Sequence, residues 1–295
     1  MEDQLKHFTE NGFVIIERAL SPNEVDRVND GIAADEAANP KEWEPGPRPG
    51  FISVGCGAPE LMHRTDALDG IPNHPSVVPL VKRILGEDAQ FCNLNFLRRE
   101  PCHADPPEDI DGDDPLALSR NWHREYSGIV EGANDNEYYT PGIQVIYNLD
   151  DTDPAIHCTS IIPESADTKR QFPKVRDADN SWGKDVLRID DGGAYVDPEK
   201  PTWLDSFGRN FPRLIGRADV HAPAGSALVF NQASYHCGTV RKTERSRGTT
   251  HVFYRVPEPT NSRHSLGKDF ESIEAFRDAL PKRKEIGIYV SLLGM

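Results

Sequence analysis

The stretch GIQVIYNL at residues 142–149 decides the fold class of this chain. Its apolar residues Ile143, Val145, Tyr147 and Leu149 recur at every second position, which describes a β-strand whose two faces have different surroundings. Shorter strand-like runs lie at residues 159–162, 220–222, 226–230 and 249–255. Many short strands separated by turn residues predict a mainly β protein with flanking helices and a sandwich or jelly-roll core.

The amino-terminal part predicts helices. Ser21, Pro22 and Glu24 form a capping-box start with proline in the first turn, so we expect a helix over residues 21–38. A second helix is expected over 75–85, where Gly86 offers a left-handed stop. We expect a single domain over residues 1–295. It would comprise a helical support (about 1–88), a jelly-roll core (about 89–256) and a carboxyl-terminal extension (about 257–295).

Composition narrows the possible partners. The 33 Lys and Arg residues against 48 Asp and Glu residues give a net charge of -15, which repels phosphate backbones and anionic membranes. Neither nucleic acid nor a membrane is therefore an expected partner. The polar start of the chain lacks a leader pattern, and 5 cysteines without a CxxC pair favour free thiols. We expect a soluble cytoplasmic protein.

Two distant segments predict a metal site. His123 and Glu125 lie in the sequence WHRE, and on a strand the period of two places both on one face. A single histidine is more often an ordinary surface or core residue, so the nearby carboxylate is what singles out His123. His236 follows another predicted strand, and a barrel would bring it to the same mouth. Two histidines and one carboxylate on one face are typical of non-haem iron(II) oxygenases.

A rival pair exists at His103 and Asp105. It lies in a segment rich in Pro and Asp, where strand periodicity is missing, so we prefer His123 as the first ligand.

Arg247 and Thr249 predict a carboxylate site beyond His236. They share one face of the next predicted strand, and a guanidinium offers a planar donor fork that matches a carboxylate. We therefore assign both to the distal carboxylate of 2-oxoglutarate. Arg241 and Arg245 are interpreted as solvated charges at the strand edge.

With these motifs the chain resembles the phytanoyl-CoA dioxygenase family of iron(II)- and 2-oxoglutarate-dependent oxygenases. The resemblance covers most of the chain, and the order and spacing of the motifs are more specific than any one of them. The matching stretches are FTENGFVII (8–16), HPSVVPLVKRILG (74–86), WHRE (122–125), GIQVIYNLDD (142–151), SIIPESA (160–166) and AGSALVF (224–230), continuing through His236 to Arg247.

The resemblance implies a double-stranded β-helix core and a dioxygenase that uses Fe(II), O2 and 2-oxoglutarate. Such an enzyme releases succinate and CO2 while it oxidises, most commonly hydroxylates, a small organic molecule. It also implies further co-substrate contacts at Arg120 and at Asn93 or Asn95. The family usually carries His-x-Asp where this chain has His123 and Glu125, and the longer carboxylate binds iron in related oxygenase families.

Other functions stay open at this point. A halogenase is disfavoured, because such relatives have a small residue where this chain has Glu125. A metal-binding cupin that isomerises or binds a small ligand would not need Arg247 and Thr249. An inactive family member would not need to retain the candidate ligands. Neither the substrate nor the oligomeric state follows from the sequence.

Overall fold

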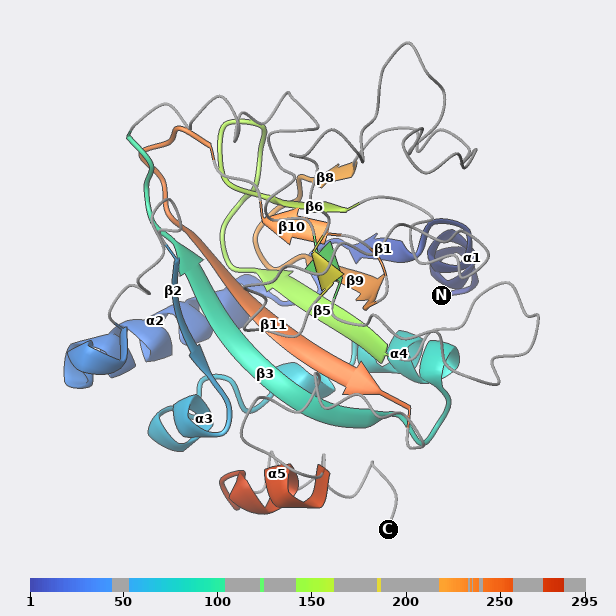
Figure 1. Ribbon diagram of the computed structural model, residues 1–295, viewed down its shortest axis with the longest axis horizontal. Helices are drawn as coiled ribbons and strands as arrows, with labels where there is room; N and C mark the ends of the chain where they lie inside the picture. The colour runs from blue at the N-terminus through green and yellow to red at the C-terminus, as the bar shows by residue number, and fades with distance from the viewer. Residues whose placement is uncertain are drawn as a thin grey trace.

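The computed structural model describes residues 1–43, 53–103, 123–124, 142–161, 185–186, 218–232, 234, 236–238, 241–256 and 273–283. Within these ranges the chain forms two antiparallel β-sheets with helices beside the larger one (Figure 1). The architecture is thus mixed α and β, with the antiparallel sheets that the strand pattern predicts.

The larger sheet has six strands in the order β1-β9-β5-β11-β3-β2. Neighbouring strands are antiparallel throughout. Their bounds are β1 Phe13–Ile16, β2 Ser53–Gly57, β3 Gln90–Arg99, β5 Gly142–Asn148, β9 Ala227–Asn231 and β11 Arg247–Arg255. Two of these strands, β1 and β2, come from the part of the sequence expected to be a helical support.

The smaller sheet has five short strands in the order β7-β4-β10-β6-β8. Their bounds are β4 His123–Arg124, β6 Thr159–Ile161, β7 Asp185–Val186, β8 Ala218–Val220 and β10 His236–Gly238.

The helices include the two that the sequence predicts. Helix α2 (Pro22–Ala38) begins with the expected capping box, in which Ser21 and Glu24 bond reciprocally. Helix α4 (Val78–Leu85) begins three residues later than expected. It ends at Gly86, whose φ of 100° is positive but whose ψ of 164° is extended instead of left-handed helical. The others are α1 Glu2–Asn11, α3 Glu60–Arg64, α5 Ile273–Ala279 and the 3-10 helices η1 Pro40–Trp43 and η2 Ile71–Asn73.

None of the helices in the described part of the chain is long and apolar enough to span a membrane.

One face of the larger sheet packs its apolar side chains against the helices. On β5 this face carries Ile143, Val145 and Tyr147, which join residues of α2 and α4 in one buried cluster. The opposite face of β5 carries Gln144, Ile146 and Asn148, all buried. The sequence prediction that the two faces of this strand have different surroundings is therefore confirmed.

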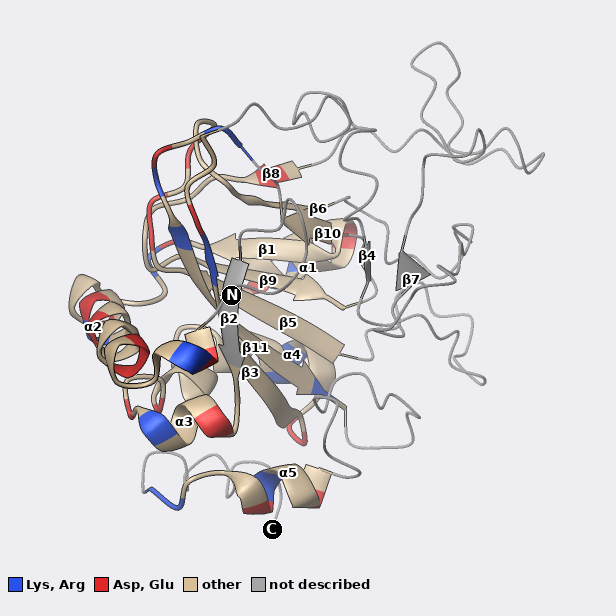
Figure 2. Cartoon of the chain, turned by 60° about the vertical axis from the view of Figure 1, so that its left-hand side comes forward, with Lys and Arg blue, Asp and Glu red and all other residues tan. Residues whose placement is uncertain are grey.

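The other face of the larger sheet looks toward the smaller sheet and is polar on β11 and β3. On β1, β5 and β9 it carries apolar residues that pack with the smaller sheet in a second buried cluster, made of Phe13, Ile146, Ile161, Val220, Leu228 and Phe230. On β11 it carries Arg247, Thr249 and His251, which pair with Arg99, Leu97 and Asn95 of β3. Arg247 also bonds to a residue of β6 in the smaller sheet. Figure 2 shows charge concentrated on the helices and at one end of the long strands, while most of the sheet surface is uncharged. We call this side of the larger sheet the inner face.

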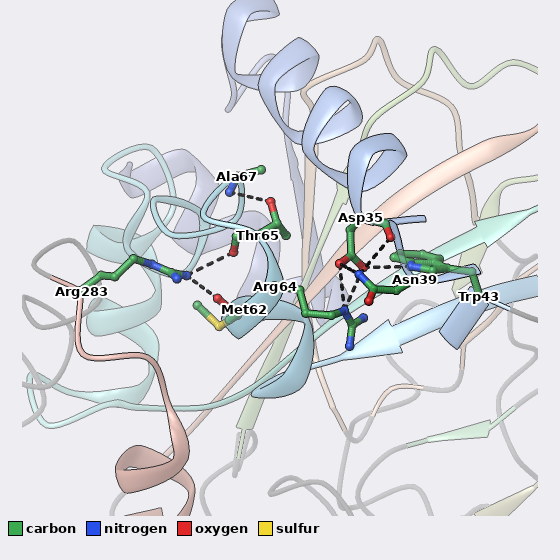
Figure 3. Close-up of polar contacts among 8 residues, drawn as sticks. All are labelled: Asp35, Asn39, Trp43, Met62, Arg64, Thr65, Ala67 and Arg283. Atoms are coloured by element: carbon green, nitrogen blue, oxygen red, sulfur yellow. Dashed lines mark hydrogen bonds and ion pairs between the residues drawn. The ribbon is translucent and has the colours of Figure 1, made fainter. Parts of the chain in front are cut away.

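A buried carboxylate holds the helical layer together (Figure 3). Asp35 of α2 is 5% exposed and accepts hydrogen bonds from Trp43 Nε1 at 2.9 Å, Arg64 Nε at 2.9 Å and Asn39 Nδ2 at 2.9 Å. One side chain thereby ties α2 to η1 and α3. Nearby, Arg283 donates to the backbone oxygens of Met62 and Thr65, which attaches the segment after α5 to α3.

Asp35→Ala should lower the free energy of unfolding by about 3–5 kcal/mol, because it leaves Arg64 as a poorly compensated charge and Trp43 without its acceptor. Urea denaturation followed by circular dichroism measures this. Asp30→Ala, on the exposed side of the same helix, is the matched control and should change stability by less than about 0.5 kcal/mol. Equal effects of the two substitutions would contradict the role of Asp35.

Candidate active site

The two candidate iron histidines lie on neighbouring strands. The backbone register pairs His236, at the start of β10, directly with His123, at the start of β4. Directly paired positions of antiparallel strands share one face of the sheet and have Cβ atoms roughly 4.5–5.5 Å apart. The fold therefore brings together two residues that are 113 positions apart in the sequence.

His236 is oriented by its surroundings. Its Nδ1 lies 3.1 Å from the backbone oxygen of Ser234, and since a carbonyl only accepts, Nδ1 carries the proton and donates it. Nε2 is consequently the basic nitrogen of this neutral tautomer. The ring packs edge-on against Phe230, with centroids 4.6 Å apart. A carbonyl that fixes the tautomer of a ligand histidine is a common feature of metal sites.

Several predicted site residues lie outside the described ranges. They are Glu125, Arg120 and Asp105. The rival ligand His103 is described: its side chain is 68% exposed and lies 3.1 Å from Glu244, beside a bridge between Cys102 and Thr243. His103 thus lies at an exposed edge of the structure, where its neighbour is the carboxylate of Glu244.

Arg247 is a buried guanidinium that joins the two sheets. Only 4% exposed, it donates from Nη2 to Asn148 Oδ1 at 2.9 Å and to Thr159 Oγ1 at 2.8 Å. Its Nε has no hydrogen-bond partner among the described residues. Burial, together with the positive charge of Arg99, lowers the pKa of Arg247 to about 10. Arg247 stays protonated at neutral pH and retains a buried donor for an anion.

Thr249 shares the inner face with Arg247, as predicted, but its hydroxyl is already bonded. Gln144 Nε2 lies 2.9 Å from His251 Nδ1, and His251 Nε2 lies 3.0 Å from Thr249 Oγ1, which is 3.1 Å from the Leu97 carbonyl. Since an amide nitrogen only donates, His251 accepts at Nδ1 and donates from Nε2. Thr249 then donates its hydroxyl hydrogen bond to the Leu97 carbonyl. A carboxylate would receive that hydrogen bond only by displacing the Leu97 carbonyl.

Asn93 and Asn95 both lie on the inner face of β3. The side-chain oxygen of Asn93 accepts from the backbone nitrogen of Leu94 at 2.8 Å. Asn95 pairs with His251 on one side and with Gly57 on the other. Its Oδ1 would lie only 2.9 Å from a Cβ at position 57, so a residue larger than glycine at that position would collide with the Asn95 side chain.

Sequence reasoning missed three residues at this site. Arg99 pairs with Arg247 on the inner face, and His251 bonds to Thr249. His157, near Arg247, bonds to the backbone of Glu100 and of Arg241. The alternation of β3 could have identified Arg99, because it follows Asn93, Asn95 and Leu97 at a period of two. His157 follows β5 in an irregular segment, where no pattern marks it.

The interpretation of Arg241 as a solvated charge is wrong. Its side chain is 15% exposed, and its Nη2 lies 3.2 Å from Oδ2 of Asp219, a residue of β8. Arg245 is 46% exposed but also pairs with a carboxylate, that of Asp153, at 2.7 Å.

One further group of possible metal ligands exists within the described ranges. Cys158, Asp219 and His221 have ligand atoms within 4.8 Å of one another. The carboxylate of Asp219, however, accepts hydrogen bonds from Ser160 and from Arg241. A cation there would have to displace a guanidinium, so we assign no metal to this group.

Comparison with known proteins decides the family. The sequence model described as phytanoyl-CoA dioxygenase (PhyH) matches residues 8–249. The chain belongs to the phytanoyl-CoA dioxygenase family. This confirms the resemblance drawn from the motifs and classes the protein with the iron(II)- and 2-oxoglutarate-dependent oxygenases. No curated protein matches the chain.

Solved structures share the fold of this phytanoyl-CoA dioxygenase family member at low identity. The carbocyclase SnoK from nogalamycin biosynthesis is 18% identical with a TM-score of 0.57, over 87% of this chain and 84% of that one. The epimerase SnoN, in complex with Fe3+, alpha ketoglutarate and nogalamycin RO, is 15% identical with a TM-score of 0.56, over 86% and 83%. HygX from Streptomyces hygroscopicus, with nickel, 2-oxoglutarate and hygromycin B bound, is 21% identical with a TM-score of 0.52, over 88% and 89%.

His157 makes the stability of this family member depend on pH. Its Nε2 donates to the Glu100 carbonyl at 3.0 Å, and its Nδ1 accepts from the backbone nitrogen of Arg241 at 2.9 Å. Burial, together with the charges of the nearby arginines, lowers the pKa of His157 from 6.5 to about 4. The unfolded chain therefore binds a proton at a higher pH than the folded one.

The stabilisation from neutral His157 should be complete above pH 6.5 and be lost as the pH falls through 6.5 toward 4. Urea denaturation at intervals between about pH 7 and about pH 4.5 measures it. The variant His157→Gln should lose less stability over this interval than the unmodified protein. Parallel curves for the two proteins would contradict the assignment.

Proposed function

We propose that this protein is an iron(II)- and 2-oxoglutarate-dependent dioxygenase that oxidises, by hydroxylation, a small organic molecule. The single observation that carries the proposal is the cross-strand pair of His123 and His236 beside the buried donor Arg247. The proposal includes a double-stranded β-helix core made from the two antiparallel sheets. It also treats residues 1–295 as one oxygenase domain.

The metal site would consist of His123, Glu125 and His236. The donor set suits iron(II), since two imidazoles and one carboxylate on one face leave positions for co-substrate and oxygen. The tautomer of His236 supports it, because it leaves Nε2 unprotonated, and a metal requires an unprotonated ring nitrogen. Glu125 would complete the triad and argues against a halogenase.

Arg247 would bind the distal carboxylate of 2-oxoglutarate. It is buried and charged, and its Nε has no partner among the described residues, which suits a ligand anion. Asn148 and Thr159 would hold the guanidinium in place, and the chain from Gln144 through His251 would orient Thr249 beside it. Asn93, Asn95 and Arg120 are the further co-substrate contacts of the proposal.

When bound, iron and 2-oxoglutarate supply an oxidation of substrate coupled to conversion of 2-oxoglutarate and O2 into succinate and CO2. The chain's own residues bind and orient. The inner face provides donors to the co-substrate, while the apolar outer face and its helices keep the strands rigid.

A small-molecule substrate fits the relatives of similar fold, of which SnoN is seen with nogalamycin RO and HygX with hygromycin B. A reducing cytoplasm is the proposed compartment, in keeping with the free thiols of Cys92, Cys102, Cys158 and Cys237. The second candidate function is a metal-binding cupin without oxidation, which would leave the buried charge of Arg247 unexplained.

His123→Ala or His236→Ala should abolish stoichiometric binding of iron(II), because each removes one of three protein ligands. Anaerobic titration with iron(II), followed by metal analysis of the desalted protein, measures this. His103→Ala is the matched control, since it removes an exposed histidine, and should keep full iron. Loss of iron in His103→Ala alone would overturn the ligand assignment.

Arg247→Ala should weaken 2-oxoglutarate binding about 10- to 100-fold, because a hydrogen bond to a charged group contributes roughly 1.5–3 kcal/mol. Arg247→Lys should restore only part of it, since an ammonium lacks the planar fork. The readout is the visible charge-transfer band of anaerobic iron(II) protein titrated with 2-oxoglutarate, with iron content measured alongside. If iron-loaded protein shows neither this band nor succinate formation in oxygen, the cupin function replaces the oxygenase.

A further inference from the structure

A second arginine lies beside Arg247 on the inner face. Arg99 is the last residue of β3, and the register pairs it directly with Arg247, the first residue of β11. Such a pair shares one face of the sheet. Arg98, the preceding residue, points the other way and bonds to Glu36 of α2 at 2.7 Å.

Both guanidinium groups extend to the same place in the smaller sheet. A Cβ on Gly238 of β10 would lie 2.2 Å from Arg99 Nη2, so the Arg99 guanidinium packs directly on this glycine. Arg247 bonds to Thr159 of β6, and Thr159 is the register partner of Gly238. Both arginine side chains thus reach the cross-strand pair formed by Thr159 and Gly238.

This place lies next to the proposed metal site. Gly238 is two residues along β10 from His236, which is roughly 6–7 Å on a strand and on the same face. A ligand that chelates a metal held by His236 and extends along β10 would therefore reach both arginines.

The local charge favours an anion there. Burial lowers the pKa of Arg99, and burial with the charge of Arg99 lowers that of Arg247. The hydrogen bonds of Arg247 go to the neutral groups of Asn148 and Thr159. Two cations side by side on one face repel each other, and a carboxylate bound between them would be attracted to both.

We propose that Arg99 binds the distal carboxylate of 2-oxoglutarate together with Arg247, as a two-arginine clamp that selects dicarboxylic oxo acids. This inference rests on the proposed function, because it assigns a further binding residue to the same co-substrate site. Gly238 is part of the clamp, since only glycine leaves room for the Arg99 guanidinium on β10.

The test compares two oxo acids on anaerobic iron(II) protein, using the charge-transfer band as the measure of binding. 2-Oxoglutarate has a distal carboxylate, whereas 2-oxobutyrate has the same chelating end without one. Arg99→Gln should weaken 2-oxoglutarate binding about 10-fold or more, and should change 2-oxobutyrate binding by less than about twofold. Iron content and the unfolding midpoint are measured for each variant.

Two further variants separate binding from structure. Arg98→Gln is the matched control: it removes the same charge one residue away, on the outer face, and should leave the preference for 2-oxoglutarate unchanged. Gly238→Ala keeps Arg99 but displaces its guanidinium, so it should reduce that preference as Arg99→Gln does.

The outcomes are distinct. Equal weakening of both acids by Arg99→Gln, or no weakening of either, would overturn the clamp while leaving the oxygenase function intact. An iron-loaded unmodified protein that forms no band with 2-oxoglutarate would instead overturn the proposed function, and the clamp with it.

Discussion

The hydrogen bonds of the buried Arg247 guanidinium join the two sheets at the candidate site. The guanidinium donates to Asn148 within the larger sheet and to Thr159 in the smaller one, at a position almost closed to water. A buried charge is tolerated only where polar groups surround it. The part of the inner face around Arg247 is therefore polar, while the strands farther from it, β1 and β9, bury apolar residues against the smaller sheet.

The opposite face of the larger sheet carries the larger apolar cluster, which includes the helices. Residues of β5, β3 and β11 pack with α2 and α4 in one continuous apolar cluster, and Asp35 ties α2 to the neighbouring helical segments. On β3 and β11, apolar packing and the candidate ligand contacts therefore lie on opposite faces of the same strands. Because each strand alternates between the two faces, a rigid apolar side fixes the positions of the polar side chains on the inner side.

Much of the local structure was predictable from short-range patterns. The alternation in residues 142–149 predicted β5, and the capping box at Ser21 predicted α2. These predictions succeeded because hydrogen bonds and side-chain periods within a few residues determine them. The prediction for Arg241 was wrong, because its partner Asp219 lies on β8, and no pattern near Arg241 in the sequence indicates that the two residues meet.

The sequence by itself determined the family, the candidate histidines and the placement of Arg247 and Thr249 on one strand face, because each depends on residue type and spacing along the chain. Only the tertiary structure decided which residues meet. The pairing of His123 with His236, the inclusion of β1 and β2 in the larger sheet, and the convergence of Arg99 and Arg247 on Gly238 and Thr159 all depend on strand order and register. Register is set by the packing of whole faces against one another, so residues far apart in the chain acquire their neighbours only when the sheets assemble.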